Sequence, residues 1–290
     1  MNRAASIVAA SLVLGWLAFS QEFAQLRMDL VAKDYTYTEG PAWSKDGYLI
    51  FSDTPGNQLL KWIPGHPAEV FRENANGPSG NAFDVEGRLY TCETRTRRVT
   101  RTDKSGKVDV LVDKFEGKRL NAPNDIVVAK AGNVYFTDPA FGWQSDSREL
   151  DFYGVFQIPV KGGLKVVARS KGRPNGIALS PSGKVLYVSN SDERNVRAYD
   201  IDKNGDASNE RILIDKVDGI PGGLCVDEKG QLFVAARGVA IYSPEGKLVH
   251  TIATHNPASN CGFAEGDLKS LMITSRGELF RTRLEVKGAY

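Results

Sequence analysis

The chain has 290 residues, with 37 Lys and Arg against 35 Asp and Glu and a formal net charge of +2. Nucleic-acid binding requires a strongly basic stripe, so this mixed charge leads us to expect no nucleic-acid partner. The length is enough for one large domain with a sizeable core. The 29 glycines recur in Asp-Gly, Glu-Gly and Ser-Gly pairs between short apolar runs, a pattern typical of β-hairpins.

The N-terminal segment has the pattern of a secretory signal peptide. Arg3 precedes an apolar run of about 16 residues that ends at Phe19, and Ala18 and Ser20 are small residues suited to a cleavage site. A membrane anchor is the alternative, but the run is short for a span. We therefore predict a signal peptide over residues 1–20, a periplasmic or secreted mature chain, and no membrane partner after cleavage.

Along the mature chain, a unit of two short apolar strands joined by a tight turn recurs six times. The first copy is Pro41–Asp53 and the last is Gly262–Thr274. The turn positions are 40, 45, 51, 47 and 38 residues apart, and they are Gly47, Gly87, Gly132, Gly183, Gly230 and Leu268. This is the period of four-stranded propeller blades. The repeat predicts an all-β fold, a six-bladed β-propeller with four-stranded blades.

The end of the repeat array indicates how the ring closes. A third strand follows every copy and a fourth follows the first five, but the sixth copy ends after its third strand. The stretch Phe23–Val31, before the first copy, supplies the missing strand. Closure removes the free sheet edges that an open array would leave, so we prefer a ring to a solenoid. The prediction is a single propeller domain over residues 21–290.

One position in each blade is predicted to face the mouth of the central channel. Counting back eight residues from each turn position gives Glu39, Ser79, Asn124, Asn175, Gly222 and Asn260. The ends of the second strands add Asp53, Glu93, Asp138 and Asn190 to the same face. Carboxylate and amide oxygens suit a hard cation such as Ca²⁺ or Mg²⁺. Each motif alone is also an ordinary turn sequence, but their fixed register favours a metal site.

A set of motifs in order resembles the gluconolactonase/regucalcin (senescence marker protein) family. They are Glu39-Gly-Pro, Phe51-Ser-Asp-Thr-Pro-Gly-Asn57, Gly117-Lys-Arg-Leu-Asn-Ala-Pro-Asn-Asp125, Tyr135-Phe-Thr-Asp138 and Arg173-Pro-Asn-Gly176. The resemblance implies a six-bladed propeller that hydrolyses lactones of sugar acids with one divalent cation, Ca²⁺ in preference to Zn²⁺ or Mg²⁺. It also implies that Glu39 and Asn175 are metal ligands, and that Asn124 binds substrate or completes the metal shell.

The chain departs from the family pattern in blade five. The family has a Pro-Asp-Gly motif there, whose Asp is a metal ligand and proposed general base, and this chain has Gly222 instead. Asp218, in the same loop, is a possible substitute. We predict that Asp138 and Glu93 are the catalytic carboxylates that accept a proton. The residues predicted to bind substrate are Asn124, Ser79, Asn260, Arg119 and Arg173.

Two functions from different classes follow. The first is a metal-dependent lactonase with a small-molecule substrate, or a related hydrolase of another ester. The alternative is a non-catalytic or altered propeller that binds a small sugar acid or a protein partner, because Gly222 removes the family's Asp. A Gly-x-Ser-x-Gly motif is absent, which disfavours a serine hydrolase. For Cys92, Cys225 and Cys261 we predict buried free thiols, with a bridge between the last two as the alternative.

Overall fold

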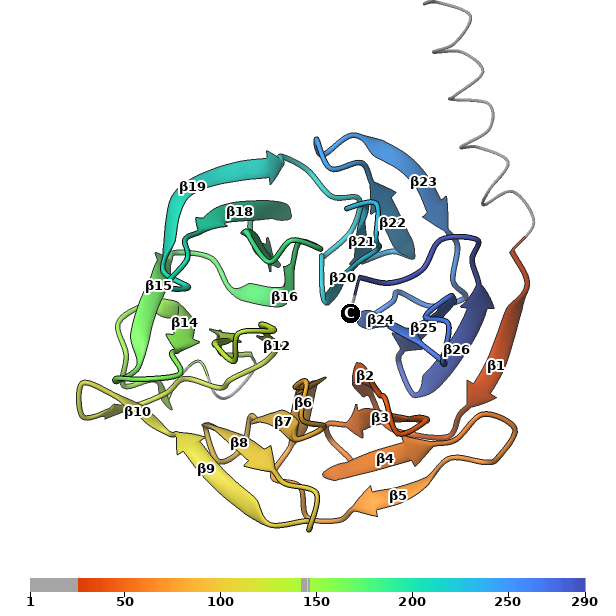
Figure 1. Cartoon of the computed structure of the whole chain (residues 1–290), viewed down its shortest axis with the longest axis horizontal. Helices are drawn as coiled ribbons and strands as arrows, with labels where there is room; N and C mark the ends of the chain where they lie inside the picture. The colour runs from red at the N-terminus through yellow and green to blue at the C-terminus, as the bar shows by residue number, and fades with distance from the viewer. Residues whose placement is uncertain (1–25, 142–144, 146, 290) are drawn as a thin grey trace, which may run out of the picture.

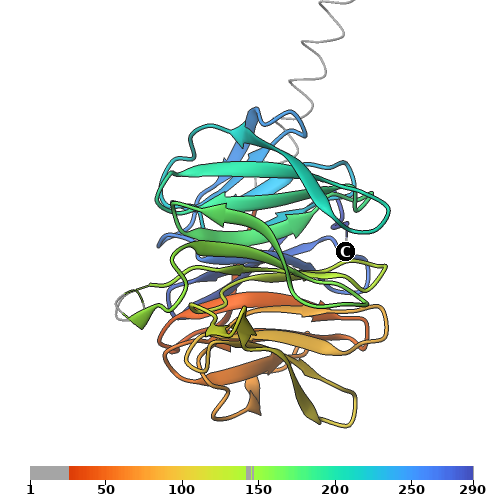
Figure 2. The ribbon, with the colours of Figure 1, turned by 90° about the vertical axis from the view of Figure 1, so that its left-hand side faces the viewer.

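The computed structural model describes residues 26–141, 145 and 147–289, so the predicted signal peptide lies outside the described residues. Six four-stranded antiparallel sheets surround a central channel, and the predicted six-bladed β-propeller is confirmed (Figure 1). Figure 2 shows the ring edge-on, with strands running from one face to the other. Among the described residues, none forms a helix long and apolar enough to cross a bilayer.

The first three blades, each given from the channel outward, are formed in chain order. Blade one has β2 (Thr38–Ser44), β3 (Tyr48–Asp53), β4 (Gln58–Trp62) and β5 (Glu69–Arg72). Blade two has β6 (Pro78–Phe83), β7 (Leu89–Glu93), β8 (Arg98–Thr102) and β9 (Val108–Val112). After the small hairpin β10 (Lys114–Phe115) and β11 (Lys118–Arg119), blade three has β12 (Ile126–Val128), β13 (Val134–Asp138), β14 (Tyr153–Ile158) and β15 (Lys165–Ser170).

The last three blades complete the ring. Blade four has β16 (Pro174–Leu179), β17 (Val185–Asn190), β18 (Asn195–Ile201) and β19 (Ala207–Ile214). Blade five has β20 (Leu224–Val226), β21 (Leu232–Ala235), β22 (Val239–Tyr242) and β23 (Leu248–Ile252). Blade six has β24 (Asn260–Ala264), β25 (Ser270–Ser275), β26 (Glu278–Arg283) and, as its outermost strand, β1 (Met28–Ala32).

The pairing of β1 with β26 closes the ring as the sequence predicted. It is antiparallel, and Met28 lies opposite Thr282. The strand begins five residues later than the stretch proposed from the sequence, at Met28. The chain therefore joins its two ends within one blade.

The turn register that defined the repeat corresponds to real hairpin turns between the first two strands. Gly47 has a φ of 89°, and Leu268, which replaces glycine in blade six, has a φ of 55°. Both values lie in the left-handed region, where glycine is favoured and Leu carries a steric cost. The sixth blade thus keeps the turn geometry without the usual residue.

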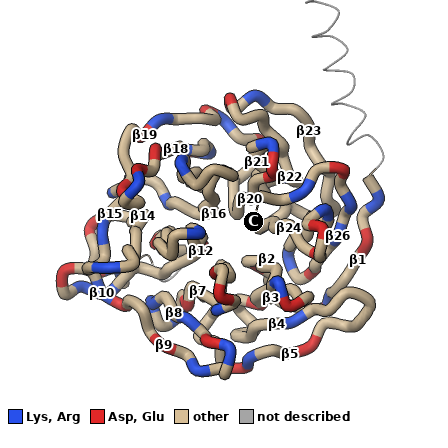
Figure 3. Tube along the Cα trace, viewed as in Figure 1, with Lys and Arg blue, Asp and Glu red and all other residues tan. Residues whose placement is uncertain are grey.

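The core lies between neighbouring blades, where alternating apolar residues of facing sheets pack together. Phe136 of blade three, for example, belongs to a buried cluster with Tyr90 of blade two, and within its own blade its ring stacks on that of Phe156 with centroids 5.4 Å apart. Charged residues of both signs are mixed around the outside of the ring (Figure 3). This arrangement leaves the polar loops at the channel mouth on a rigid scaffold.

Candidate active site at the channel mouth

The six innermost strands surround a cavity of about 180 Å³ in the central channel. Residues of all six strands line it, and Asp125 is the one acidic residue among the described lining residues. At its polar end the blades are held together by main-chain bonds. The Gly80 N–H donates to the Asn124 carbonyl at 2.7 Å, and the Gly223 N–H donates to the Ser259 carbonyl at 2.8 Å.

Glycine makes room for the polar side chains at this end of the channel. The position after the predicted mouth residue is glycine in four blades, namely Gly40, Gly80, Gly176 and Gly223. A Cβ atom on Gly80 would collide with the Asp125 carboxylate, and one on Gly223 would collide with the Asn260 amide. The blades can therefore approach closely here only because these positions lack side chains.

Glu39 lies half-buried at the start of blade one. Its Oε2 accepts hydrogen bonds from the Gly40 N–H and the Asn260 amide, both at 3.2 Å. Burial and then the nearby charge of Asp125 raise the pKa of Glu39 to about 8, against the lowering effect of those two bonds. No ion pair to Glu39 is found among the described residues. Its carboxylate therefore lacks a cationic partner from the described part of the chain.

Asp125, 6% exposed, is a second carboxylate of this group, and the sequence analysis missed it. It accepts main-chain hydrogen bonds from Ile126 at 3.0 Å and from Ile177 of the next blade at 3.2 Å. Burial raises its pKa to about 7, although these bonds and one from Asn260 lower it. The available signal was its position in the repeat. Asp125 directly follows a predicted mouth residue, and four of the six residues at this position are glycine, whereas Asp125 is the one acid.

Asn260 connects the two carboxylates. Its Oδ1 accepts the Cys261 N–H at 2.8 Å, which directs the amide nitrogen toward the acids. That nitrogen donates to Glu39 at 3.2 Å, and the nearby Asn260 amide also lowers the pKa of Asp125. The structure thus brings the predicted residues Glu39 and Asn260 together, with Asp125 as the third member. We call these three residues the mouth cluster.

The Asn175 amide is oriented by its neighbours. The Ser191 hydroxyl donates to the Pro221 carbonyl at 3.0 Å, so it must accept from the Asn175 Nδ2, also at 3.0 Å. The Asn175 Oδ1 accepts no hydrogen bond from the described residues and remains available to a ligand. Asn124 is half-buried, and its carbonyl accepts the Gly80 N–H. Ser79 is buried, and its carbonyl accepts the Ser52 hydroxyl at 2.7 Å.

The mouth residues fit a hard cation in their chemistry. Glu39 offers a carboxylate without a cationic partner among the described residues, and Asn175 offers a free amide oxygen. Such oxygens are the ligands that Ca²⁺ prefers. The described residues contain no cluster of three or more His, Cys, Asp or Glu side chains suited to a metal. A cation at the mouth would therefore rest on mixed carboxylate and amide ligands.

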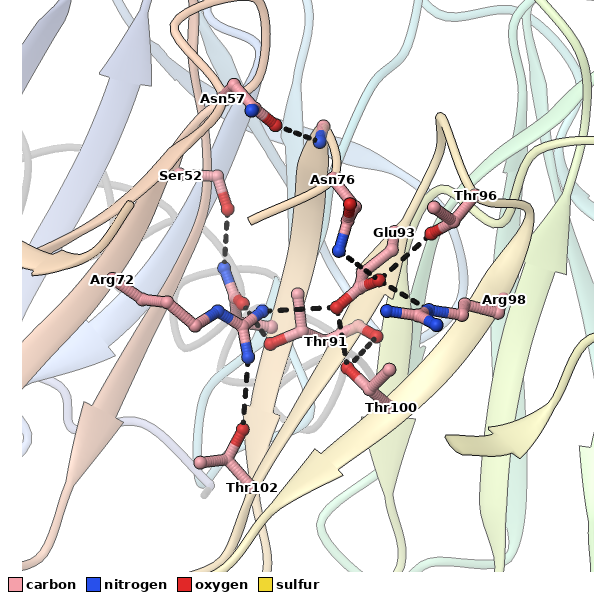
Figure 4. Close-up of polar contacts among 12 residues, drawn as sticks. Ser52, Asn57, Arg72, Asn76, Thr91, Glu93, Thr96, Arg98, Thr100 and Thr102 are labelled. Atoms are coloured by element: carbon pink, nitrogen blue, oxygen red, sulfur yellow. Dashed lines mark hydrogen bonds and ion pairs between the residues drawn. The ribbon is translucent and has the colours of Figure 1, made fainter. Parts of the chain in front are cut away.

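The structure does not bring Glu93 to the channel cavity. It is 1% exposed, and its carboxylate is surrounded by donors from β5, β8 and neighbouring loops (Figure 4). The Arg98 Nε lies 2.6 Å away and an Arg72 terminal nitrogen 3.3 Å away. Further hydrogen bonds come from Asn76, Thr96 and Thr100. Both oxygens are thus engaged, and these contacts give Glu93 a structural role.

Asp138 and Asp53, the last residues of β13 and β3, are held by main-chain donors in a similar way. Asp138 is fully buried, and it accepts the main-chain N–H groups of Asn121 and Ala122, both at 2.8 Å. Burial raises its pKa to about 7, although those hydrogen bonds lower it. Asp53 accepts from Tyr37 at 3.0 Å and Thr36 at 3.1 Å. Neither carboxylate lines the channel cavity, and neither do the mouth residues Glu39 and Asn175, so the lining does not decide the role of Asp138. What distinguishes Asp138 is that both of its oxygens accept main-chain N–H groups of its own blade.

The two arginines predicted to bind substrate lie in different surroundings. Arg119 belongs to the exposed strand β11, and its main-chain N–H donates to Glu149 at 2.8 Å. The Arg173 Nε lies 3.0 Å from an Asp192 oxygen, and the guanidinium carbon lies 4.8 Å from the centroid of the Phe141 ring. The charge of Arg173 is therefore already paired.

The backbone around Gly222, where the family has a carboxylate, leaves no room for a side chain. The Gly222 N–H donates to Ala235 at 2.8 Å, and its carbonyl accepts the Ser189 hydroxyl at 2.6 Å. A Cβ atom on Gly222 would collide with the Ser259 carbonyl. Asp218, the suggested substitute, is mostly exposed and forms an ion pair with Arg237 at 3.3 Å. Only glycine therefore fits at position 222 with this backbone.

Comparison with known proteins identifies relatives across nearly the whole fold. A family profile described as "SMP-30/Gluconolactonase/LRE-like region" matches residues 37–277. The gluconolactonase of Zymomonas mobilis is 35% identical over 295 aligned residues, which cover 90% of this chain and 82% of that protein. These matches confirm the family resemblance indicated by the sequence motifs.

Solved structures give the same result at the level of the fold. A gluconolactonase from Xanthomonas campestris superposes with a TM-score of 0.85 at 34% identity, covering 92% of both chains. A calcium-binding protein, regucalcin, from Agrobacterium tumefaciens has a TM-score of 0.77 over 91% of this chain and 95% of that one, at 17% identity. At that identity the likeness shows the fold alone.

Proposed function

This chain belongs to the SMP-30/gluconolactonase/LRE-like family, and on that premise we propose that it hydrolyses a lactone of a sugar acid with a divalent cation at the channel mouth. The observation that carries the proposal is Glu39. It is a half-buried carboxylate without a cationic partner among the described residues, at the mouth of a propeller 35% identical to a gluconolactonase.

We assign the cation to Glu39, Asn175 and Asn124, with Ca²⁺ preferred over Zn²⁺ or Mg²⁺ because all three residues offer oxygen atoms. When bound, such a cation supplies Lewis-acid polarisation of the lactone carbonyl. It would also relieve the desolvation of Glu39, whose pKa burial raises to about 8.

The chain's own residues position and neutralise the reacting groups. Asn260 donates to Glu39, and the Ile126 and Ile177 N–H groups donate to Asp125, so both carboxylates are held in direction. Ser79 and Asn124, at the same mouth, offer a hydroxyl and an amide to the substrate. The attacking water must lose a proton to a nearby base. Our candidates are Glu39 and Asp125, because Glu93 and Asp138 are enclosed by their own hydrogen-bond partners.

The second candidate is a propeller that binds a sugar acid without hydrolysing it. Gly222 favours this alternative, since the family's Asp is missing and the surrounding backbone leaves no space for a Cβ atom. Both functions require a cation at the channel mouth, so cation binding alone does not separate them. Only the first function predicts turnover of a lactone.

The test follows acid release from δ-gluconolactone above spontaneous opening, with EDTA and then with Ca²⁺, Zn²⁺ or Mg²⁺ restored. Glu39→Gln is the site variant, and Glu69→Gln is the control because Glu69 lies on the exposed strand β5. We expect turnover that EDTA abolishes, that a cation restores, and that only Glu39→Gln loses. Cation binding with product affinity but no turnover would favour the non-catalytic alternative. No cation binding by the native chain would overturn the metal site.

We also propose that the chain is exported and cleaved after Ser20. The apolar run behind Arg3 and the small residues Ala18 and Ser20 support this proposal. N-terminal sequencing of protein from the secreted or periplasmic fraction should begin at Gln21. A full-length chain retained in the cytoplasm would contradict it.

A further inference from the structure

Two cysteine sulfurs touch each other in the channel. Cys225 lies on β20 of blade five and Cys261 on β24 of blade six, and their Sγ atoms are 3.1 Å apart. Cys261 is 3% exposed and Cys225 is half-buried, and both line the channel cavity. Both belong to innermost strands, so the contact joins two neighbouring blades.

The third cysteine is placed elsewhere. Cys92 is fully buried on β7, in a core cluster with Tyr90 and Leu120. All three cysteines are thiols in this structure. The pairing of Cys225 with Cys261 is therefore set by position, and Cys92 serves as an internal reference for a buried thiol.

We propose that Cys225 and Cys261 are an oxidation site at which a disulfide cross-links blades five and six beside the mouth cluster. A disulfide needs a sulfur separation of about 2.05 Å, so the two sulfurs must approach by roughly 1 Å. The bond closes a loop of 36 residues, which includes the rest of blade five. The two channel strands then cannot separate when either blade opens.

Hydrogen peroxide is the oxidant we assign, because it is small enough to enter a cavity of about 180 Å³. The Cys225 thiolate attacks one peroxide oxygen and breaks the O–O bond, which gives a sulfenic acid and, after protonation, water. The Cys261 thiol then attacks the Cys225 sulfur, breaks the S–O bond and releases a second water. Two thiols lose two electrons and two protons, and the peroxide is reduced to two waters.

The cross-link reaches the mouth cluster through one residue. The Cys261 N–H donates to the Asn260 Oδ1 at 2.8 Å, and Asn260 in turn donates to Glu39. Oxidation therefore fixes the strand that carries Asn260 against blade five. The reduced protein keeps the same contacts without the covalent restraint.

Mass spectrometry tests the bond directly. The native chain is incubated with and without hydrogen peroxide at pH 9, because burial raises the pKa of the Cys225 thiol and the thiolate is the nucleophile. It is then unfolded, alkylated and digested. We expect a cross-linked peptide pair containing Cys225 and Cys261, with alkylation of Cys92 alone. Three alkylated cysteines, a pair that includes Cys92, or oxygen added to single cysteines would each overturn the proposal.

Thermal unfolding gives a second readout that does not depend on lactone turnover. Each variant is compared with itself, oxidised against reduced, so a loss of stability from the substitution cancels. We expect the native chain and Cys92→Ala to unfold on the order of 10 °C higher when oxidised. Cys225→Ala and Cys261→Ala should show no difference. An equal shift in Cys225→Ala would overturn the proposal, and if a variant does not fold, the peptide map of the native chain decides.

Discussion

Glu39 of blade one and Glu93 of blade two are both at least half-buried, but their carboxylates have very different numbers of hydrogen-bond and ion-pair partners. Glu93 in blade two is 1% exposed and is contacted by two arginines and three further side-chain donors. Among the described residues, Glu39 in blade one receives only the Gly40 N–H and the Asn260 amide. Both carboxylates have lost most of their water, but the described residues compensate the charge of only one.

The difference separates a structural carboxylate from a candidate ligand. A buried charge is tolerated when cations and hydrogen bonds replace its water, and removal of one partner leaves the other uncompensated. Glu93 meets this condition within the fold. Glu39 does not, and burial raises its pKa to about 8, so an added cation would complete its surroundings. Substitution of either glutamate tests this contrast.

Glu39→Gln should abolish function without unfolding the protein. We expect lactone turnover to fall by roughly 1000-fold, because the substitution removes the only carboxylate among the proposed ligands, which costs about 4 kcal/mol of transition-state stabilisation. The free energy of unfolding in EDTA should not decrease, since a neutral amide avoids the cost of a desolvated charge. Initial rates and urea unfolding check both parts. A large loss of stability would place Glu39 in the same class as Glu93.

Glu93→Gln should show the reverse. The substitution leaves Arg72 and Arg98 beside a neutral amide, so we expect the free energy of unfolding to fall by about 3 kcal/mol. Turnover per folded molecule should stay within about threefold of the native value, because such surrounding contacts do not contribute to transition-state binding. The measurement is urea unfolding, with rates taken well below the midpoint. Loss of turnover in the folded variant would support the catalytic role predicted from the sequence.

Gly222→Asp tests whether the mouth accepts one more carboxylate. A Cβ atom there would collide with the Ser259 carbonyl, so we expect a loss of about 2 kcal/mol in the free energy of unfolding and no gain in turnover. Gly222→Ala is the matched control, because it adds the same Cβ without the charge. Equal losses in both variants would confirm the collision. Higher turnover in the aspartate variant alone would show that the backbone yields and that the carboxylate is used.

The pH dependence of stability should also distinguish the mouth cluster. Burial raises the pKa of Glu39 to about 8 and that of Asp125 to about 7, so the folded state holds protons that the unfolded state has lost. As far as these groups contribute, metal-free protein should therefore be most stable below about pH 4, and this contribution should be lost progressively as the pH rises to 8.5. Asp125→Asn should show a shallower decline in urea titrations. An unchanged slope would place the effect elsewhere.

The fold was largely predictable because it repeats. Each turn residue indicates which residues of the two flanking strands pair in one hairpin. Six such turns, spaced by the length of a blade, predict the propeller. Position at the mouth was predictable in the same way for Glu39, Asn175 and Asn260. Asp125 was missed because only the residue eight positions before each turn was considered. Asp125 is the next residue along the strand and lies deeper in the channel.

The second-strand carboxylates show where the repeat gives too little information. Strand ends share a face of the ring, but the direction of each side chain depends on its cross-strand partners. Glu93 lies opposite Arg98 across the β7–β8 hairpin, and a nearby arginine five residues later was the available signal. Arg72 comes from the outer strand of another blade, and no spacing in the sequence indicates that contact.

The pairing of β1 with β26 has a consequence for the order of events during synthesis. Residues 28 and 282 become neighbours only after almost the entire chain has left the ribosome. Blades one to five contain their own strands and can form as they emerge, whereas blade six waits for both of its contributors. Contacts so distant along the chain form slowly. We therefore expect the pairing of β1 with β26 to be the last of the sheet pairings to form, and until then the growing propeller is an open arc.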